Sequence, residues 1–261
     1  MRPAMKISVI TVTFNSLPAL RRTARSVSAQ DFKDFEYIVI DGAGGDGTED
    51  FLKEEKRIDK WLSEPDGGIY EAMNKGVRLA SGDYCLFLNA GDCFAGDKVL
   101  SKVAPLLDGE DILLGNELHF DENGRLDGFT SSRNKFTVEN MFRSSISHQA
   151  AFIRRALLLA HPYDESLRLV SDWKFFLERR LDPETTFRAL DIDVCFFSGG
   201  GATDRFRDLG ARERQDVLQA YPEYRDIWQS PYAPSFWCKV RNKTGYYIKK
   251  ITYSLKEKHM A

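Results

Sequence analysis

The sequence lacks most features of membrane, secreted and nucleic-acid-binding proteins. Its 261 residues include four cysteines, and because these lie far apart without a C-x-x-C pair, neither a zinc site nor a disulfide framework is expected. No stretch approaches the roughly 18 consecutive apolar residues of a membrane-spanning helix. The 37 Lys and Arg nearly balance the 39 Asp and Glu, so a net charge of −2 gives no basic surface for nucleic acid. The expected compartment is the cytoplasm, and no nucleic-acid partner is expected.

Two common phosphate-binding motifs are missing as well. The sequence contains neither G-x-x-x-x-G-K-[ST] nor a G-x-G-x-x-G between the first predicted strand and the helix that follows it. The loop at that point reads Thr13-Phe14-Asn15-Ser16-Leu17-Pro18, and the glycine-rich segment at residues 41–48 lacks the lysine of a P-loop. These absences exclude a P-loop and a dinucleotide-binding fingerprint.

The N-terminal half shows a regular alternation of strands and helices. Runs rich in β-branched and aromatic residues predict strands, and the stretches between them predict helices. Strands separated by helices of this length pair in parallel through right-handed crossovers. The sequence therefore predicts an α/β fold with a Rossmann-like, mainly parallel sheet flanked by helices. The predicted strands are 6–13, 35–40, 58–62 and 84–88, and the predicted helices are 18–30 and 69–80.

The C-terminal half is less regular. Gly199, Gly200 and Gly201, followed by Thr203, form either a flexible lid or a loop that needs positive φ, and both interpretations stay open. The predicted strands of this half are 112–120, 126–129, 149–153 and 187–197, and its predicted helices are 171–180 and 207–221.

The C-terminal residues 232–261 are strongly basic. From Ser235 onward, seven basic residues face one acidic residue, and apolar residues recur at roughly helical spacing. A basic amphipathic helix of this kind lies on anionic membrane surfaces, which predicts peripheral attachment to the cytoplasmic face of a membrane. Packing of this helix on the rest of the protein is the alternative.

Polar side chains gather where the predicted parallel strands end. In open parallel sheets, ligands bind in the crevice beyond the carboxyl ends of the strands. Carboxylates in such a place suit Mg²⁺ or Mn²⁺, which prefer oxygen ligands and share their coordination shell with substrate phosphates. The sequence thus predicts a nucleotide-diphosphate ligand with a divalent cation. The residues concerned are Thr11, Thr13, Asn15, Asp41, Asp66, Asn89 and Asp92.

Five segments of the first hundred residues, in this order and spacing, resemble the family 2 inverting glycosyltransferases. The variant of the pattern with Asp-Gly-Gly-Ile-Tyr and Leu-Asn-Ala-Gly-Asp is similar to the bacterial branch that builds surface polysaccharides. The resemblance implies a GT-A fold, a nucleotide-sugar donor with UDP-sugars first among the candidates, Mn²⁺ or Mg²⁺, and a saccharide or lipid-linked saccharide acceptor. The segments are ITVTFN (10–15), VIDGAGGDGT (39–48), EPDGGIYEAMNKG (64–76), ASGDY (80–84) and FLNAGD (87–92).

The resemblance also assigns roles to residues at the strand ends. Asp41 and Asp66 correspond to contacts with the nucleobase and ribose, and Thr11 and Asn15 would line the nucleotide. Asp92 matches the surviving acid of the metal-binding D-x-D element, which here reads Asn89-Ala90-Gly91-Asp92 and retains one carboxylate. Two consequences are therefore open: the affinity for a metal is low, or the metal is held mainly by the diphosphate.

Three residues are expected to act on the sugars. An inverting transfer needs a base that removes the proton from the attacking hydroxyl, and in the resembled family this base is an acid at the start of a helix in the acceptor half. Asp172 occupies that place, at the predicted N-terminus of helix 171–180, where the helix dipole favours a carboxylate. His148 and Asn89 are expected to contact the donor or acceptor sugar. For His148, a contact with the diphosphate or a buried, satisfied histidine are the alternatives.

The expected organisation is a glycosyltransferase domain over residues 1–231. Residues 1–100 would bind the nucleotide, residues 101–231 would bind the acceptor, and residues 232–261 would form the basic C-terminal helix. Two other functions stay open. One is a sugar nucleotidyltransferase, although the glycine-rich, arginine-containing N-terminal loop of that class is missing. The other is a catalytically silent nucleotide- or sugar-binding module, which the reduced element at residues 89–92 would suit.

Overall fold

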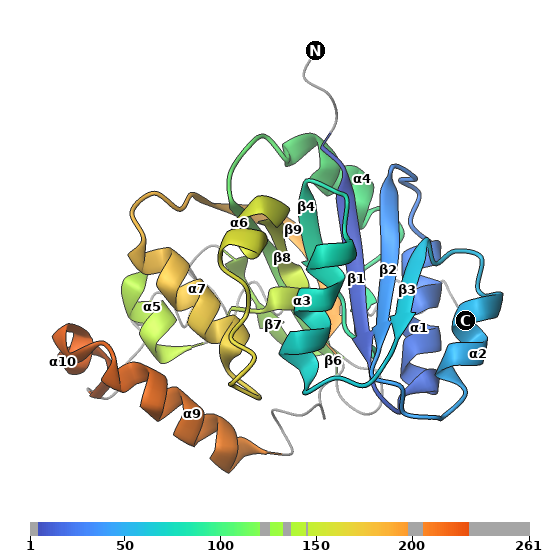
Figure 1. Ribbon diagram of the computed structural model, residues 1–261. Coiled ribbons are helices and arrows are strands. Elements are labelled where there is room, and N and C mark those ends of the chain that lie inside the picture. Colours follow the sequence, from blue (N-terminus) through green and yellow to red (C-terminus); the bar gives the residue numbers. More distant parts are fainter. Residues whose placement is uncertain (1–4, 121–125, 133–136, 145, 198–205, 230–261) are drawn as a thin grey trace.

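The computed structural model describes residues 5–120, 126–132, 137–144, 146–197 and 206–229. The predicted C-terminal helix at 232–261 lies outside the described residues, and so do Gly199, Gly200, Gly201 and Thr203. In the part that is described, helices flank one central sheet (Figure 1).

The first half forms four parallel strands with connecting helices, as the sequence predicts. Every residue of the first strand is buried, which agrees with its β-branched, apolar composition. The strands are β1 (Ile7–Thr13), β2 (Phe35–Asp41), β3 (Lys60–Ser63) and β4 (Tyr84–Phe87), and the helices are α1 (Leu17–Ser28), α2 (Thr48–Glu54) and α3 (Ile69–Leu79).

The strand order reverses direction between β1 and β4. From β1 the chain proceeds outward to β2 and β3, and it then returns through α3 to place β4 on the other side of β1. Parallel strands nearly always connect through right-handed crossovers, so a reversal of the strand order puts α1 and α3 on opposite faces of the sheet, as Figure 1 shows. A reversal of this kind opens a crevice at the carboxyl ends of the two strands, which is where ligands of such sheets bind.

The second half adds strands of both directions to the same sheet. The full order is β3-β2-β1-β4-β8-β6-β9-β5, with β7 paired to β6. β8 runs antiparallel to β4 and β6, so β6 and β9 again point the same way as the first four strands. The strands of this half are β5 (Cys93–Phe94), β6 (Ile112–Phe120), β7 (Leu126–Thr130), β8 (Ala151–Arg154) and β9 (Phe187–Phe197).

Helices α5, α6, α7, α9 and α10 gather beside the α3 face of the sheet, whereas α4 lies on the opposite side near the end of α1 (Figure 1). Trp173 of α7 is almost completely buried, and its indole donates to the carbonyl of Met141 in α5 at 2.7 Å. The guanidinium of Arg214 in α9 lies over the same indole, 4.3 Å from the ring centroid, so one tryptophan joins three helices. The helices of the second half are α4 (Val99–Val103), α5 (Val138–Arg143), α6 (Arg155–Ala160), α7 (Ser171–Leu181), α9 (Arg207–Gln219) and α10 (Arg225–Gln229).

Candidate functional site

Three buried oxygens at the carboxyl ends of neighbouring strands have no hydrogen-bond partner among the described residues. They are Oγ1 of Thr13 at the end of β1, Oδ1 of Asp41 at the end of β2, and Oδ1 of Asn89 just beyond β4. A buried polar group without a partner costs about 1–3 kcal/mol, so native proteins rarely keep several in one place without a function. We call this group, together with Asp66, the strand-end edge.

Asp66 faces the end of β2. A Cβ placed on Gly42 would lie 2.9 Å from Oδ2 of Asp66, so only glycine lets the two segments approach this closely. Asp66 Oδ1 accepts from the backbone N–H of Gly68 at 3.0 Å, and the other oxygen of Asp41 accepts from Ser63 at 2.7 Å. Partial burial raises the pKa of Asp66, and the nearby carboxylates of Glu71 and Asp41 add to the rise.

The loops after β1 and β2 carry unusual backbone conformations. Asn15 and Ala43 both have positive φ, at 48° and 57°, and they are the non-glycine residues with this conformation in the described part of the chain. Such strain costs about 1–3 kcal/mol for each residue and is concentrated in binding sites. Asn15 is exposed beside the strand-end edge, as a residue that lines a ligand must be.

Thr11 lies deeper than expected. It is completely buried within β1, where its hydroxyl donates to the carbonyl of Leu88 at 2.7 Å and accepts from the Tyr37 hydroxyl at 3.1 Å. Both interactions are internal to the sheet, so Thr11 does not reach the crevice. Thr13, two residues further along the same strand, is the threonine whose hydroxyl oxygen lacks a partner there.

Asp92 is buried in a loop that α1 fixes in place. The hydroxyl of Thr23 donates to the carbonyl of Asp92 at 2.8 Å and accepts from the N–H of Gly91 at 2.9 Å. Nowhere in the part of the chain that the structure describes do three or more His, Cys, Asp or Glu side chains cluster as a metal site. One carboxylate is still a sufficient protein ligand for a cation that is held mainly by substrate phosphates.

Asp172, near the start of α7, receives hydrogen bonds from two distant parts of the chain. Its Oδ1 accepts from the hydroxyl of Tyr70 at 2.7 Å, and its Oδ2 lies 2.8 Å from Nδ1 of His148. Its side chain is 14% exposed and that of His148 is 12% exposed. A carboxylate offers about four acceptor positions, so Asp172 retains capacity for a further donor. We call Tyr70, His148 and Asp172 the Asp172 cluster.

Asn89 connects the Asp172 cluster to the strand-end edge. Its amide nitrogen lies 3.1 Å from Nε2 of His148. With the amide in this orientation its nitrogen donates, so Nε2 accepts and Nδ1 carries the proton that is donated to Asp172. A continuous hydrogen-bonded path therefore runs from Asn89 through His148 to Asp172 and Tyr70.

Asp172 and His148 stabilise each other's charged forms. Burial by itself would raise the pKa of Asp172, but the hydrogen bonds from His148 and Tyr70 and the charge of His148 outweigh it, so the pKa falls below its ordinary value. Burial would lower the pKa of His148, but the Asp172 carboxylate more than compensates and the pKa rises. Asp172 is thus held as an anion, beside an imidazole that takes up a proton more readily than a free histidine does.

Tyr70 is held rigidly in place. It lies in the first turn of α3, and its ring packs against that of Tyr163 with a centroid distance of 5.7 Å. Asn74, one turn later, donates to the carbonyl of Tyr163 at 2.9 Å and accepts from the N–H of the same residue at 3.0 Å. These contacts fix α3 against the segment that precedes α7, so the Tyr70–Asp172 hydrogen bond spans two anchored elements.

The structure therefore brings Asn89, His148 and Asp172 into one chain of contacts, and it places Asp41 and Asp66 together at the strand-end edge. Sequence reasoning missed Tyr70, although this residue stands within the segment Asp66-Gly67-Gly68-Ile69-Tyr70 that carries the resemblance. The available signal was an aromatic hydroxyl in the first turn of a helix that begins at the predicted ligand edge.

Comparison with known proteins identifies the chain's relatives. The model of glycosyl transferase family 2 matches residues 8–160. An uncharacterised glycosyltransferase of Mycobacterium tuberculosis, Rv1514c, is 34% identical over 236 residues, which cover 85% of this chain and 87% of that protein. A PGL/p-HBAD biosynthesis glycosyltransferase of the same species, Rv2957, is 30% identical over 210 residues, or 76% of this chain and 78% of its own length.

Solved structures share the fold. TarS 1-349 of S. aureus in complex with UDP superimposes with a TM-score of 0.64 at 20% identity, covering 86% of this chain and 73% of that one. The mannosyltransferase PcManGT of Pyrobaculum calidifontis, in complex with GDP-Man and Mn²⁺, gives a TM-score of 0.61 at 16% identity over 89% of this chain and 67% of that one. The predicted GT-A fold is thereby confirmed. Among the described residues, no helix has the length and apolar character needed to cross a membrane.

Proposed function

Because the chain belongs to glycosyl transferase family 2, we propose that it is an inverting glycosyltransferase that moves a sugar from a UDP-sugar to a hydroxyl of a saccharide or lipid-linked saccharide. Support for a role in bacterial surface-polysaccharide synthesis comes from a related protein of Bacillus subtilis, the putative teichuronic acid biosynthesis glycosyltransferase TuaG. Support for the donor comes from TarS 1-349, whose fold is shared and whose structure holds UDP-GlcNAc in a further complex.

In this proposal the strand-end edge binds the nucleotide. The unpartnered oxygens of Thr13 and Asp41 accept hydrogen bonds from the base and ribose, and Asp66 faces them across Gly42. Asn15 contacts the nucleotide from the strained loop after β1. Because these oxygens are buried without partners, a ligand that donates to them recovers the cost of their desolvation.

Asp92 is the protein ligand of Mn²⁺ or Mg²⁺ in the proposed mechanism. When bound, the cation would stabilise the negative charge that develops on the departing diphosphate. Because the protein would supply only one carboxylate to the cation, metal binding would depend on the nucleotide, as is usual for Mg²⁺ in sites that carry phosphates.

The single observation that carries the catalytic proposal is the position of Asp172. Its carboxylate is ionised, partly exposed and fixed by Tyr70 and His148, which are the properties a general base needs. The acceptor hydroxyl gives its proton to Asp172 as its oxygen attacks the anomeric carbon from the face opposite the diphosphate. His148 orients the carboxylate through its bond to Oδ2. Because the bond between the anomeric carbon and the diphosphate breaks in the same step, the anomeric configuration is inverted.

A binding and turnover experiment tests this function. The purified chain is screened against UDP-sugars and GDP-sugars with Mn²⁺ or with EDTA, and both Tm and released nucleotide are measured. A donor sugar that binds only the folded state should raise Tm, and the increase should depend on the metal. If donors raise Tm but no nucleotide is released with any acceptor or with water, the protein is a binding module. If no nucleotide sugar raises Tm, the proposal fails.

The location of the reaction is part of the same proposal. The basic tail at 232–261 would hold the enzyme on the cytoplasmic face of a membrane, where a lipid-linked acceptor is presented. Truncation after Tyr232 should then abolish sedimentation with anionic liposomes while UDP affinity is unchanged. Sedimentation that survives the truncation would remove the tail from the proposal.

A further inference from the structure

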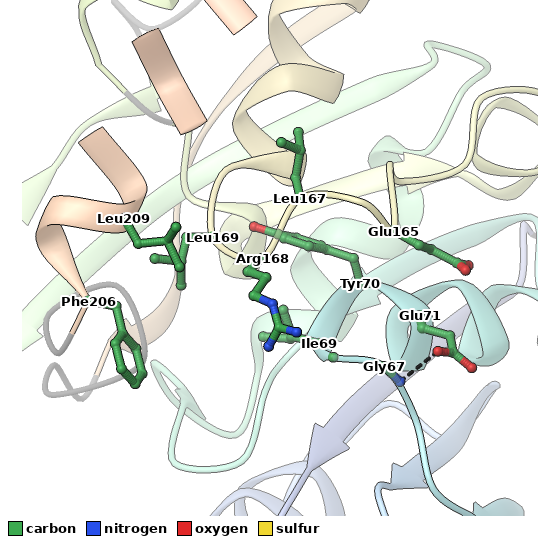
Figure 2. Close-up of a pocket in the computed structure, with 11 residues that line it drawn as sticks. Gly67, Ile69, Tyr70, Glu71, Glu165, Leu167, Arg168, Leu169, Phe206 and Leu209 are labelled. Atoms are coloured by element: carbon green, nitrogen blue, oxygen red, sulfur yellow. Dashed lines mark hydrogen bonds between the residues drawn. The ribbon is translucent and has the colours of Figure 1, made fainter. Parts of the chain in front are cut away.

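An apolar cavity of about 240 Å³ lies beside the Asp172 cluster (Figure 2). It is enclosed by the loop that leads into α3, by residues 165–169, and by the start of α9. Its lining includes the side chains of Ile69, Tyr70, Leu167, Leu169, Phe206 and Leu209. Phe206 is 57% exposed, although phenylalanine is usually buried in folded proteins.

The walls of the cavity are fixed by hydrogen bonds rather than by the apolar groups themselves. Glu213 of α9 accepts from the backbone N–H groups of Arg168 at 2.8 Å and Leu169 at 2.9 Å. Glu71 accepts from the N–H of Gly67 at 2.6 Å, as Figure 2 shows. The cavity is therefore a built feature of the fold, because each side of it is tied down independently.

Few polar groups in the lining are available to a ligand. The carboxylate of Glu71 also pairs with Lys75 at 3.0 Å, and that of Glu165 accepts from Asn74 at 2.8 Å. Of the side chains drawn in Figure 2, the guanidinium of Arg168 carries no hydrogen bond or ion pair to the described residues. A sugar ring would bury several hydroxyls here without partners, at a cost of about 1–3 kcal/mol each. The lining instead favours an apolar occupant.

The size of the cavity limits that occupant to about one ring. An apolar cavity of about 150 Å³ lined by leucine, isoleucine and phenylalanine holds benzene. A volume of about 240 Å³ therefore accommodates a single ring and the atom that links it to a sugar. Arg168 belongs to the lining, and a planar guanidinium stacks well on the face of an aromatic ring.

Tyr70 joins the cavity to the proposed catalytic base. Its ring lines the cavity, and its hydroxyl donates to Asp172 at 2.7 Å. A group that packs against this ring therefore contacts the residue that also hydrogen-bonds Asp172, whose side chain is 14% exposed. We propose that the cavity binds an apolar, ring-sized aglycone of the acceptor, so that the enzyme selects aryl glycosides over sugars that lack such a group. This inference rests on the proposed function.

Matched pairs of acceptor analogues test the inference. Phenyl and methyl glycosides of glucose, galactose, N-acetylglucosamine and rhamnose are titrated into the protein with UDP and Mn²⁺, and Kd is measured by ligand-observed NMR. For at least one sugar the phenyl glycoside should bind about tenfold more tightly, because burying a ring-sized apolar group is worth at least that factor. Equal Kd values within twofold for every pair, with UDP affinity intact, would overturn it.

Substitutions in the lining test whether the preference for phenyl glycosides arises in this cavity. Leu167→Ser and Phe206→Ser should each reduce the phenyl preference to less than about threefold, whereas Leu79→Ser, an equivalent change at an exposed leucine at the far end of α3, should leave it unchanged. UDP affinity and Tm of each variant report folding. If Leu167→Ser and Phe206→Ser both keep the phenyl preference, the ring binds outside this cavity and the inference is overturned. Phenyl preference without any UDP binding would contradict the proposed function and still support the apolar ligand class.

Discussion

The strand-end edge and the Asp172 cluster are both buried and polar, but their hydrogen bonds are completed in opposite ways. At the strand-end edge, oxygens of Thr13, Asp41 and Asn89 have no partner among the described residues. In the Asp172 cluster, both carboxylate oxygens and both imidazole nitrogens have partners within 3.1 Å. One region is incomplete and the other is already assembled.

This difference suggests that the strand-end edge serves binding and that the Asp172 cluster serves catalysis. Unpartnered groups at the strand-end edge contribute affinity when a ligand pairs with them, because the protein has already borne the cost of burying them. A prearranged cluster contributes little to affinity, but it holds a base in its ionised state and correct position before the substrate arrives. Changes in the two regions should therefore affect different constants, with affinity falling in the first and turnover in the second.

The largest expected effect follows from Asp172→Asn. Asparagine keeps the shape of the side chain and can still accept from His148, but it cannot take up a proton. Turnover should fall by ~10²–10⁴-fold, the range typical of general-base catalysis, while UDP affinity stays within twofold. Steady-state kinetics and calorimetry on the same preparation measure the two constants.

Asp164→Asn is the matched control for this change. Asp164 precedes the same helix and pairs with Lys174 at 2.6 Å, so its loss removes a partly exposed ion pair without touching the Asp172 cluster. Its turnover should remain near that of the wild type. Turnover of Asp172→Asn within a few-fold of the wild type would mean that the cluster is structural and that another group removes the proton.

Asp92→Asn should produce the next largest effect. If Asp92 ligates the cation, turnover should fall by ~10²-fold, because charge stabilisation by a metal is worth several kcal/mol. The enhancement of UDP affinity by Mn²⁺ should also disappear, whereas metal-free UDP affinity and Tm should be retained. Asp97→Asn, at an exposed acid in the following loop, serves as the control. Full activity of the wild type in EDTA would contradict the assignment.

Asp41→Ala should act on affinity alone. Its loss removes the unpartnered Oδ1 and frees Ser63, so UDP binding should weaken by ~1–3 kcal/mol, or about 5- to 150-fold in Kd. Turnover at saturating donor should stay within a few-fold of the wild type. Asp50→Ala, at a carboxylate that is 83% exposed on α2, is the control and should change neither constant. Unchanged UDP affinity in a folded Asp41→Ala protein would remove Asp41 from the site.

Much of the strand-end edge could be predicted from the sequence, because it depends only on the succession of strands and helices along the chain. Once β1, β2 and β4 are recognised as parallel strands, their carboxyl ends must share an edge, and Asp41 and Asn89 follow from their positions alone. The exception is Thr11. Its side chain turns into the sheet, since the hydroxyl satisfies the carbonyl of Leu88, and nothing in the sequence distinguishes it from Thr13.

The Asp172 cluster was predictable only in part, because it depends on contacts between remote segments. Asp172 could be identified as an acid at a helix start, but Tyr70 lies 102 residues away in sequence and His148 lies 24 away. Their meeting depends on β8 entering the sheet beside β4 and on Asn74 fixing α3. Such long-range packing leaves no periodic signal. The sequence therefore does not identify Asn89 and Asp172 as the partners of the two ring nitrogens of His148.

Tyr70→Phe should give the smallest effect and the most specific one. The hydroxyl of Tyr70 is one of the donors that lower the pKa of Asp172, so its removal should raise that pKa. Activity requires the ionised carboxylate, and the acid limb of the kcat/KM profile should therefore move to higher pH. Near pH 7 the carboxylate remains ionised, and turnover should change by less than about tenfold.

The same substitution should also change the pH dependence of stability. A carboxyl whose pKa is lower in the folded state stabilises the protein above its unfolded pKa of about 4, and this contribution is lost as the pH falls. Tyr70→Phe should thus cost ~1 kcal/mol at pH 7 and less at pH 3. Tyr84→Phe removes an equivalent hydroxyl that donates to the carbonyl of Glu110 at 2.7 Å, far from any carboxylate of the cluster. Tyr84→Phe should lose stability without moving the acid limb of the kcat/KM profile. If the acid limb also stays in place in Tyr70→Phe, Tyr70 supports the fold rather than the base.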